Sequence, residues 1–198
     1  MRRSVMKDSE KGFLGWNWIK KQLDKFYGEK RLRNRALFLT TFKTGGRITE
    51  VLSLKRSNFT HDQDYIIING MMKEKDKERK TYRPIKIPKK EPLNQEWITW
   101  VNSSRNYLFP STELDDKPLS RIRAYQIITR TGTYPHFLRS QRSSMEIEFY
   151  GIEPNRLVDL RQWKTDRMVR VYASASSQKQ AEEKMLEKFK EPLSRSNP

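Results

Sequence analysis

The sequence has no cysteine and only two histidines, His61 and His136, among its 198 residues. Without cysteine the chain can form no disulfide and offers no thiolate to a metal ion. A zinc site built on the two imidazoles would need carboxylates for most of its ligands. These scarcities exclude a disulfide-stabilised domain and argue against a zinc enzyme, so we expect no metal site.

Acidic residues are also few relative to basic ones. Lysine and arginine number 41 against 24 aspartates and glutamates, which gives a formal net charge of +17 and a pI near 10.1. Such an excess favours binding to a polyanion by counterion release, with an affinity that falls as salt rises. The charge therefore favours a nucleic acid as the partner, although a basic protein without such a partner can have the same composition.

Long apolar runs are missing as well. No stretch approaches the ~20 apolar residues of a membrane-spanning helix, and no signal-peptide pattern opens the chain. We expect no membrane partner and a cytoplasmic location with the nucleic acid. The length of 198 residues predicts one domain with a substantial core.

Hydrophobic periodicity predicts a mainly α (α+β) fold with a small antiparallel β-sheet. Residues 1–11 are polar and charged and are expected to be flexible. β-branched residues predict strands over residues 65–68 and 83–88, and the polar run between them, residues 73–80, suits a solvated hairpin tip. Helices are predicted over residues 13–27, 32–42, 47–54, 94–103, 120–130, 135–150, 154–163 and 165–172, with an amphipathic tail helix over residues 178–190.

Three short segments carry residue types suited to chemistry. They are T-G-G-R-I-T-E-V-L at residues 44–52, P-H-F-L-R at residues 135–139, and a late pair in which Tyr172 follows Trp163 by nine residues. His136 and Arg139 are one helical turn apart and should share a face. Two arginines, a histidine, an indole and a tyrosine form a set able to attack a phosphodiester without a metal.

The arginines have a physical role in such an attack. A phosphodiester under attack becomes a five-coordinate phosphorane with charge on its non-bridging oxygens, and without a metal that charge must be met by fixed donors. A guanidinium stays charged and matches phosphate oxygens in a bidentate fork. Arg47 and Arg139 are therefore the predicted phosphate clamps, each weighed against the alternative of an ordinary surface arginine.

With these segments in order, the chain resembles the catalytic domain of the tyrosine recombinase (integrase) family. Residues 44–54 resemble its first arginine box, residues 136–139 its H-x-x-R box, and Trp163 with Tyr172 its last two positions. The likeness runs from about residue 13 to residue 189. The style of the last two boxes resembles archaeal and archaeal-virus integrases.

The resemblance assigns a role to each of the remaining residues. It implies that His136 contacts the phosphate and assists proton movement at the tyrosine, as an imidazole titrating near neutrality can. Trp163 would donate its indole N–H to a non-bridging oxygen. Tyr172 would be the nucleophile; its phenol, with an ordinary pKa near 10, would need nearby positive charge or a base.

The general acid is a choice among several lysines. The family places a lysine on the hairpin, where it protonates the departing 5′ oxygen. We choose Lys73, which follows Met71 and Met72 on the outgoing strand, because this pattern resembles that of long-hairpin integrases. Lys75, Lys77 and Lys80 remain alternatives.

Other side chains receive supporting or structural roles. Glu50, one turn after Arg47, either supports that arginine or forms an ordinary salt bridge within the helix. His61 is interpreted as a solvated loop residue. Trp97 is interpreted as a packing residue and Tyr125 as a packing or capping residue.

The resemblance implies a single catalytic domain. We predict a flexible segment over residues 1–11 and a catalytic domain over residues 12–198, without the N-terminal core-binding domain that full-length integrases usually carry. The predicted activity is site-specific recombination of double-stranded DNA through a 3′-phosphotyrosyl intermediate. No cofactor is expected, because the phosphotyrosine keeps the bond energy. The resemblance also implies a monomer when free and a tetramer on two synapsed duplexes.

Two other functions remain open at this point. A type IB topoisomerase uses the same chemistry and most of the same residues to relax supercoils as a monomer. A non-catalytic DNA-binding module, derived from an integrase, would only occupy its sites.

Overall fold

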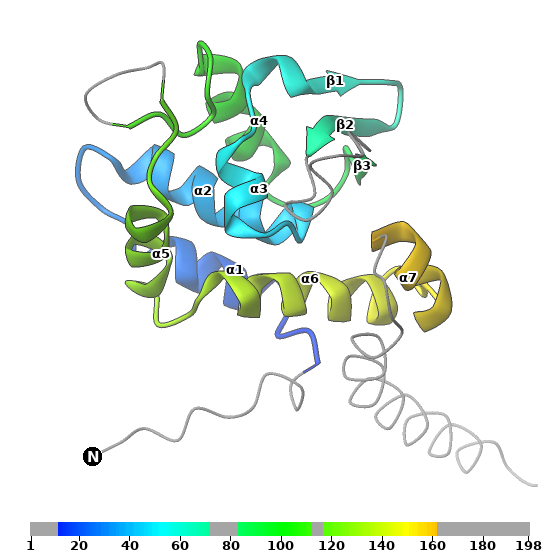
Figure 1. Cartoon of the computed structure of the whole chain (residues 1–198). Coiled ribbons are helices and arrows are strands. Elements are labelled where there is room, and N and C mark those ends of the chain that lie inside the picture. The colour runs from blue at the N-terminus through cyan, green and yellow to red at the C-terminus, as the bar shows by residue number, and fades with distance from the viewer. Residues whose placement is uncertain (1–11, 72–82, 112–116, 162–198) are drawn as a thin grey trace, which may run out of the picture. The chain divides into compact units, whose positions relative to one another are not determined.

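The structure is mostly helical, with one small sheet (Figure 1). The computed structural model describes residues 12–71, 83–111 and 117–161. Its helices are α1 Trp16–Leu23, α2 Arg31–Thr44, α3 Ile48–Leu52, α4 Asn94–Ser103, α5 Arg121–Thr129, α6 Pro135–Glu148 and α7 Pro154–Arg161, with a 3-10 turn at Arg56–Asn58. Its strands are β1 Phe59–His61, β2 Tyr65–Met71 and β3 Arg83–Pro88. The predicted mainly α class with a small antiparallel sheet is confirmed.

The chain divides into two compact units. One consists of Leu14–Arg142, and the other of Met1–Phe13 with Ser143–Pro198, so the division falls within α6. In the second unit, Ile147 and Leu157 form a small buried core against which Ile152 packs. The first unit holds the larger core and is described next.

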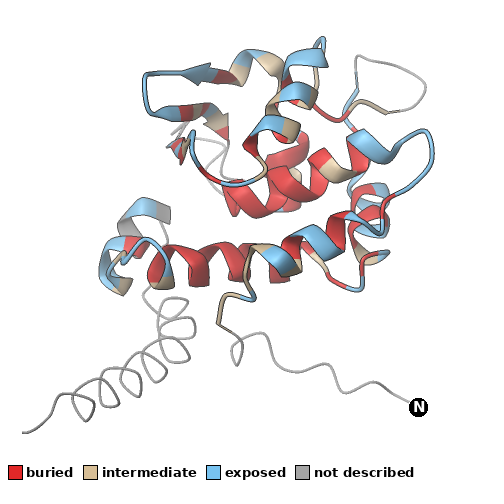
Figure 2. Cartoon of the chain, turned by 180° about the vertical axis from the view of Figure 1, so that it is seen from behind, coloured by how far each residue is buried: buried red, intermediate tan, exposed pale blue. Residues whose placement is uncertain are grey.

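Helix α2 is the centre of the larger unit. It contacts α3, α4, α5 and β3, and nearly every residue from Arg33 onward is buried (Figure 2). The hydroxyls of Thr40 and Thr41 donate to the carbonyl oxygens of Ala36 and Leu37 at 2.7 and 2.8 Å, which satisfies these polar groups within the helix. A helix buried on all sides can thus carry polar residues at little cost.

The sheet has the strand order β1-β2-β3, and both pairings are antiparallel. Ile66 lies opposite Ile87, and Ile68 lies opposite Ile85, so the buried residues of β2 and β3 share one face. A bulge between Ile68 and Met71 interrupts the register, and Gly70 takes φ 79° there.

Strand β1 is absent from the sequence prediction, which placed His61 in a loop. Instead, His61 is the exposed last residue of β1 and pairs with Ile66. A strand of three residues is too short to show a period of two, so its pairing depends on the neighbouring strand rather than on its own pattern.

The glycine pair after α2 has two separate physical reasons. Gly45 ends the helix in the left-handed conformation, φ 55° and ψ 24°, and its N–H donates to Phe42 O at 3.1 Å. Gly46 is approached closely by the terminal methyl of Met71, so a Cβ at this position would require the Met71 side chain to move. These glycines set the direction in which the chain leaves α2 toward Arg47.

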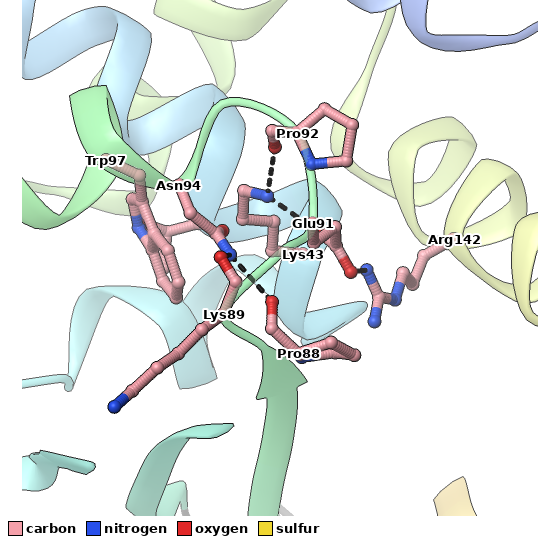
Figure 3. A network of polar contacts seen from close by, with 9 residues as sticks. Lys43, Pro88, Lys89, Glu91, Pro92, Asn94, Trp97 and Arg142 are labelled. Carbon is pink, nitrogen blue, oxygen red and sulfur yellow. Dashed lines mark hydrogen bonds and ion pairs between the residues drawn. The ribbon is translucent and has the colours of Figure 1, made fainter. Parts of the chain in front are cut away.

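Lys43, in the last turn of α2, is fully buried, and Figure 3 shows its polar contacts. Its Nζ donates to Glu91 Oε1 and to Pro92 O, each at 2.8 Å. It also lies over the rings of Trp16 and Trp97, at 5.3 and 5.7 Å from their centroids. Burial lowers the pKa of Lys43 from 10.5 to about 8, although Glu91 opposes this shift.

The lowered pKa predicts a pH-dependent contribution to stability. Between about pH 8 and 10.5 the folded state holds fewer protons at Lys43 than the unfolded state does, so this group's contribution to the free energy of unfolding rises with pH in that window. Lys43→Met should remove a slope of up to about 1.4 kcal/mol per pH unit. Urea denaturation between pH 7.5 and 10 measures it, with the exposed Lys21→Met as the matched control. Equal slopes in the two variants would contradict the prediction.

Candidate functional site

A pocket of about 370 Å³ in the larger unit gathers three of the residues predicted from sequence. Arg47 reaches it from the segment between α2 and α3, and His136 and Arg139 from the first turns of α6. The full lining is Gly46, Arg47, Ile48, Thr49, Arg121, Tyr125, Tyr134, Pro135, His136 and Arg139. Residues that are far apart in the sequence therefore share one cavity.

Helix α6 presents His136 and Arg139 to the same side. Pro135 is the first residue of α6, where the missing N–H of proline costs no helical hydrogen bond. His136 follows it and is exposed, whereas Arg139, one turn further on, is only 9% exposed. Arg139 Nη1 donates to Gly45 O at 3.0 Å, so the guanidinium is held against the loop that carries Arg47.

Glu50 holds Arg47 by both its backbone and its side chain. Glu50 Oε2 accepts from Arg47 N at 2.7 Å, which caps α3, and Oε1 lies 3.5 Å from Arg47 Nη1. The carboxylate is buried, while the Arg47 side chain is 46% exposed. The two interpretations of Glu50, support of the arginine and an ordinary helix salt bridge, therefore apply together, and Arg47 is oriented but open to a ligand.

Helix α5 adds two lining residues that the sequence analysis did not select. Arg121 and Tyr125 are one turn apart, and both are exposed. Tyr125 lines the pocket with 49% of its surface exposed, whereas the sequence analysis assigned it to packing or capping. The remaining face of α5 is buried through Ala124, Ile127 and Ile128. Among 41 lysines and arginines, nothing in the local sequence distinguishes Arg121.

The pocket is strongly positive. Three guanidinium groups and one imidazole line it, and no carboxylate is present among the described lining residues. Fixed arginine donors of this kind match the oxygens of a phosphate group. The site is therefore suited to an anion with several oxygens.

The other predicted site residues, Lys73, Trp163 and Tyr172, lie outside the described residues. The same is true of the alternative acids Lys75, Lys77 and Lys80, and of the helices predicted over residues 165–172 and 178–190. Strand β2 ends at Met71, two residues before Lys73, and β3 begins at Arg83.

The part of the chain that the structure describes offers neither a metal site nor a membrane span. It contains no group of three or more His, Cys, Asp and Glu side chains placed to bind a metal ion. None of its helices combines the length and apolar character needed to cross a membrane.

The chain matches the phage integrase family over residues 19–179, which is most of its length. The chain belongs to the phage integrase family. The resemblance to tyrosine recombinases inferred from the sequence is thereby confirmed at the level of the family. No curated protein matches this phage integrase family member.

Solved structures share the fold of this phage integrase family member. XerH site-specific recombinase, in a post-cleavage complex with its palindromic difH substrate, has a TM-score of 0.63 at 20% identity, over 87% of this chain and 52% of XerH. The integrase of mycobacterium phage Brujita has a TM-score of 0.52 at 17% identity, over 80% and 53%. The Tn1549 transposon integrase in complex with transposon right-end DNA has a TM-score of 0.56 at 15% identity, over 85% and 65%. The chain thus spans about half the length of XerH and of the Brujita integrase.

The contacts of Glu50 predict a measurable cost when it is replaced. Glu50→Ala should lower the free energy of unfolding by about 1–3 kcal/mol, because it removes a helix cap and the partner of Arg47. Glu50→Gln should cost less, since its amide oxygen can still accept from Arg47 N. Urea denaturation of both variants measures the difference, and equal losses would contradict the capping role.

Proposed function

We propose that this protein cuts and rejoins double-stranded DNA as a site-specific recombinase, through a covalent 3′-phosphotyrosyl intermediate. The observation that carries the proposal is that Arg47, His136 and Arg139 line the same pocket in a chain of the phage integrase family. The net charge of +17 supports a polyanionic partner. XerH and the Tn1549 integrase, which share the fold, are themselves described in complexes with DNA.

Arg47 and Arg139 would bind the phosphate undergoing attack. Each is held by an internal partner, Glu50 for Arg47 and the Gly45 carbonyl for Arg139. Guanidinium groups fixed in this way need little reorganisation when charge develops on the non-bridging oxygens, which is the condition for electrostatic stabilisation of a transition state. In this proposal His136 contacts the same phosphate, and Trp163 donates its indole N–H to it.

Tyr172 would be the nucleophile. Its Oη attacks phosphorus and loses its proton, with His136 as the proposed acceptor, while the bond from phosphorus to the 5′ oxygen breaks. The departing oxygen takes a proton from Lys73 and leaves as a 5′-hydroxyl. Attack on the phosphotyrosine by another 5′-hydroxyl reverses the step and restores Tyr172. The phosphodiester energy is kept in the covalent link between Tyr172 and the DNA, so the reaction needs no cofactor.

The assembly and setting follow from this chemistry. Exchange of strands between two duplexes needs several protomers, so we propose a monomer that forms a tetramer on a DNA synapse. The protein would act in the cytoplasm, in association with its target DNA. The archaeal or archaeal-virus style of residues 150–152 and 163–165 is part of the same proposal. The single catalytic domain over residues 12–198 is also kept as a proposal.

A nicked DNA substrate tests the proposal directly. Cleavage close to a nick releases a short fragment, which diffuses away and leaves the protein trapped on the DNA. A pool of nicked duplexes randomised around the nick should give a covalent adduct with the wild type, seen on denaturing gels. Tyr172→Phe should abolish it because the phenolic oxygen is lost.

The control for that experiment is Tyr27→Phe, since Tyr27 is 87% exposed and lies outside the pocket. This variant should form the adduct at the wild-type rate. Wild-type protein that forms no adduct on any duplex of the pool would refute the proposal. Adduct formation accompanied by relaxation of supercoiled plasmid by a monomer would instead indicate a type IB topoisomerase.

Arg121 is predicted to contact the DNA from the pocket wall. Arg121→Gln should lower the single-turnover cleavage rate by about tenfold or more, because a hydrogen bond to a charged group contributes about 1.5–3 kcal/mol. Arg123→Gln is the matched control: this exposed arginine lies on the same helix but does not line the pocket. Its cleavage rate at saturating DNA should stay within about twofold of the wild type. Equal effects of the two substitutions would mean that Arg121 contributes only its positive charge and makes no specific contact in the pocket.

A further inference from the structure

A buried carboxylate joins three segments of the larger unit. Glu91 Oε1 accepts from Lys43 Nζ on α2, and Glu91 Oε2 accepts from Arg142 Nη1 on α6, both at 2.8 Å (Figure 3). The side chains of Lys43 and Glu91 are 0% exposed and that of Arg142 is 2% exposed. Lys43, Glu91 and Arg142 are called the Glu91 cluster below.

Each member of the Glu91 cluster is close in sequence to a residue or segment of the proposed active site. Lys43 precedes Arg47 by four residues, and the helix that contains it ends in the loop to Arg47. Arg142 follows Arg139 by three residues, one turn along α6. Glu91 follows the end of β3, and its N–H donates to Pro88 O at 3.0 Å. Strand β3 pairs with β2, which ends two residues before the candidate acid Lys73 in the sequence.

We propose that the Glu91 cluster positions the active site, because it fixes the Arg47 loop, the helix of His136 and Arg139, and the base of the hairpin relative to one another. The inference rests on the proposed function and extends it to residues that touch no substrate. Glu91, Lys43 and Arg142 are in this sense positioning residues rather than catalytic ones.

The cost of burying charge explains why the cluster would allow only one relative placement of α2, α6 and Glu91. Two cations and one carboxylate are removed from water. The cost of this desolvation is offset only if every group keeps its partner at good geometry. A shift of α2 relative to α6 would leave a buried ion without its partner, which costs far more than the loss of an apolar contact. The cluster therefore resists small displacements that purely apolar contacts would tolerate.

Neighbouring contacts extend this constraint to the pocket. Thr44 Oγ1 donates to Thr40 O at 2.6 Å and accepts from Gly46 N at 3.1 Å, and Trp97 Nε1 donates to Thr40 Oγ1 at 2.8 Å. These bonds continue from the end of α2 to the residue directly before Arg47. The hydrogen bond from Arg139 to the carbonyl oxygen of Gly45 links α6 directly to the same loop. A displacement at the Glu91 cluster is thus transmitted to both proposed clamps.

The test separates positioning from stability. Arg142→Met removes one ion pair of the cluster, whereas Arg142→Lys keeps the positive charge and one donor nitrogen. The matched control is Arg35→Met: Arg35 lies on the same α2 as Lys43 and bonds Glu96 of α4, away from the pocket. The substrate is the nicked duplex pool on which wild-type adduct formation is measured. The readouts are the single-turnover rate of adduct formation at saturating DNA, the dissociation constant for DNA, and the urea midpoint.

A positioning role predicts a split between these readouts. Arg142→Met should lower the rate by about tenfold or more, since small misplacements of positioning groups cost up to about 100-fold. The dissociation constant should stay within about threefold, because a single pocket is a small part of the phosphate contacts. Arg142→Lys should recover most of the rate. Arg35→Met should lower the urea midpoint yet leave the rate of the folded protein within about twofold of wild type.

The outcomes distinguish the two proposals. If the wild type forms the adduct and Arg142→Met cleaves as fast as Arg35→Met does, the positioning role is wrong while the proposed function stands. If the wild type forms no adduct, both are wrong. If Arg142→Met does not fold, Lys43→Met takes its place because it removes the other ion pair of the cluster, and a wild-type rate in that variant would overturn the inference.

Discussion

The hydrogen bond from Arg139 Nη1 to the carbonyl oxygen of Gly45 is the constraint on which the pocket depends. It joins residues 94 positions apart and ties the first turns of α6 to the loop that leads to Arg47. A guanidinium remains charged at any accessible pH, so its burial demands permanent acceptors. The loop supplies one because Gly45, in its left-handed conformation, ends α2 at that point.

Around this bond the core of the larger unit is polar to an unusual degree. Nearly every residue of α2 from Arg33 to Thr44 is buried, and α6 is buried from Phe137 to Arg142 although it carries Arg139 and Arg142. Apolar packing alone would allow the two helices to settle at several offsets, whereas paired ions and hydroxyls permit few. A site proposed to hold two guanidinium groups on one phosphate would gain from such a core, since fixed donors need little reorganisation when charge develops on the phosphate.

Some elements could be predicted from sequence because their signals are local. The periodicity of Asn94–Ser103 predicted α4 with its observed bounds, and the β-branched run at Tyr65 predicted the start of β2. The glycine pair predicted the end of α2 through backbone freedom alone. Strand β1 was missed, since three residues carry no readable period and pair only because β2 lies beside them.

The sequence by itself determined the family, the basic character, and the residue types suited to a phosphate: Arg47, His136 and Arg139 could be selected because the order and spacing of short motifs are properties of the linear chain. The tertiary structure alone decided that these three share one pocket, that Arg121 and Tyr125 line it too, and that Glu91 meets both Lys43 and Arg142. Such contacts join residues from distant parts of the chain. They arise only when burial forces each polar group to find a partner, and no local pattern encodes which partner it finds.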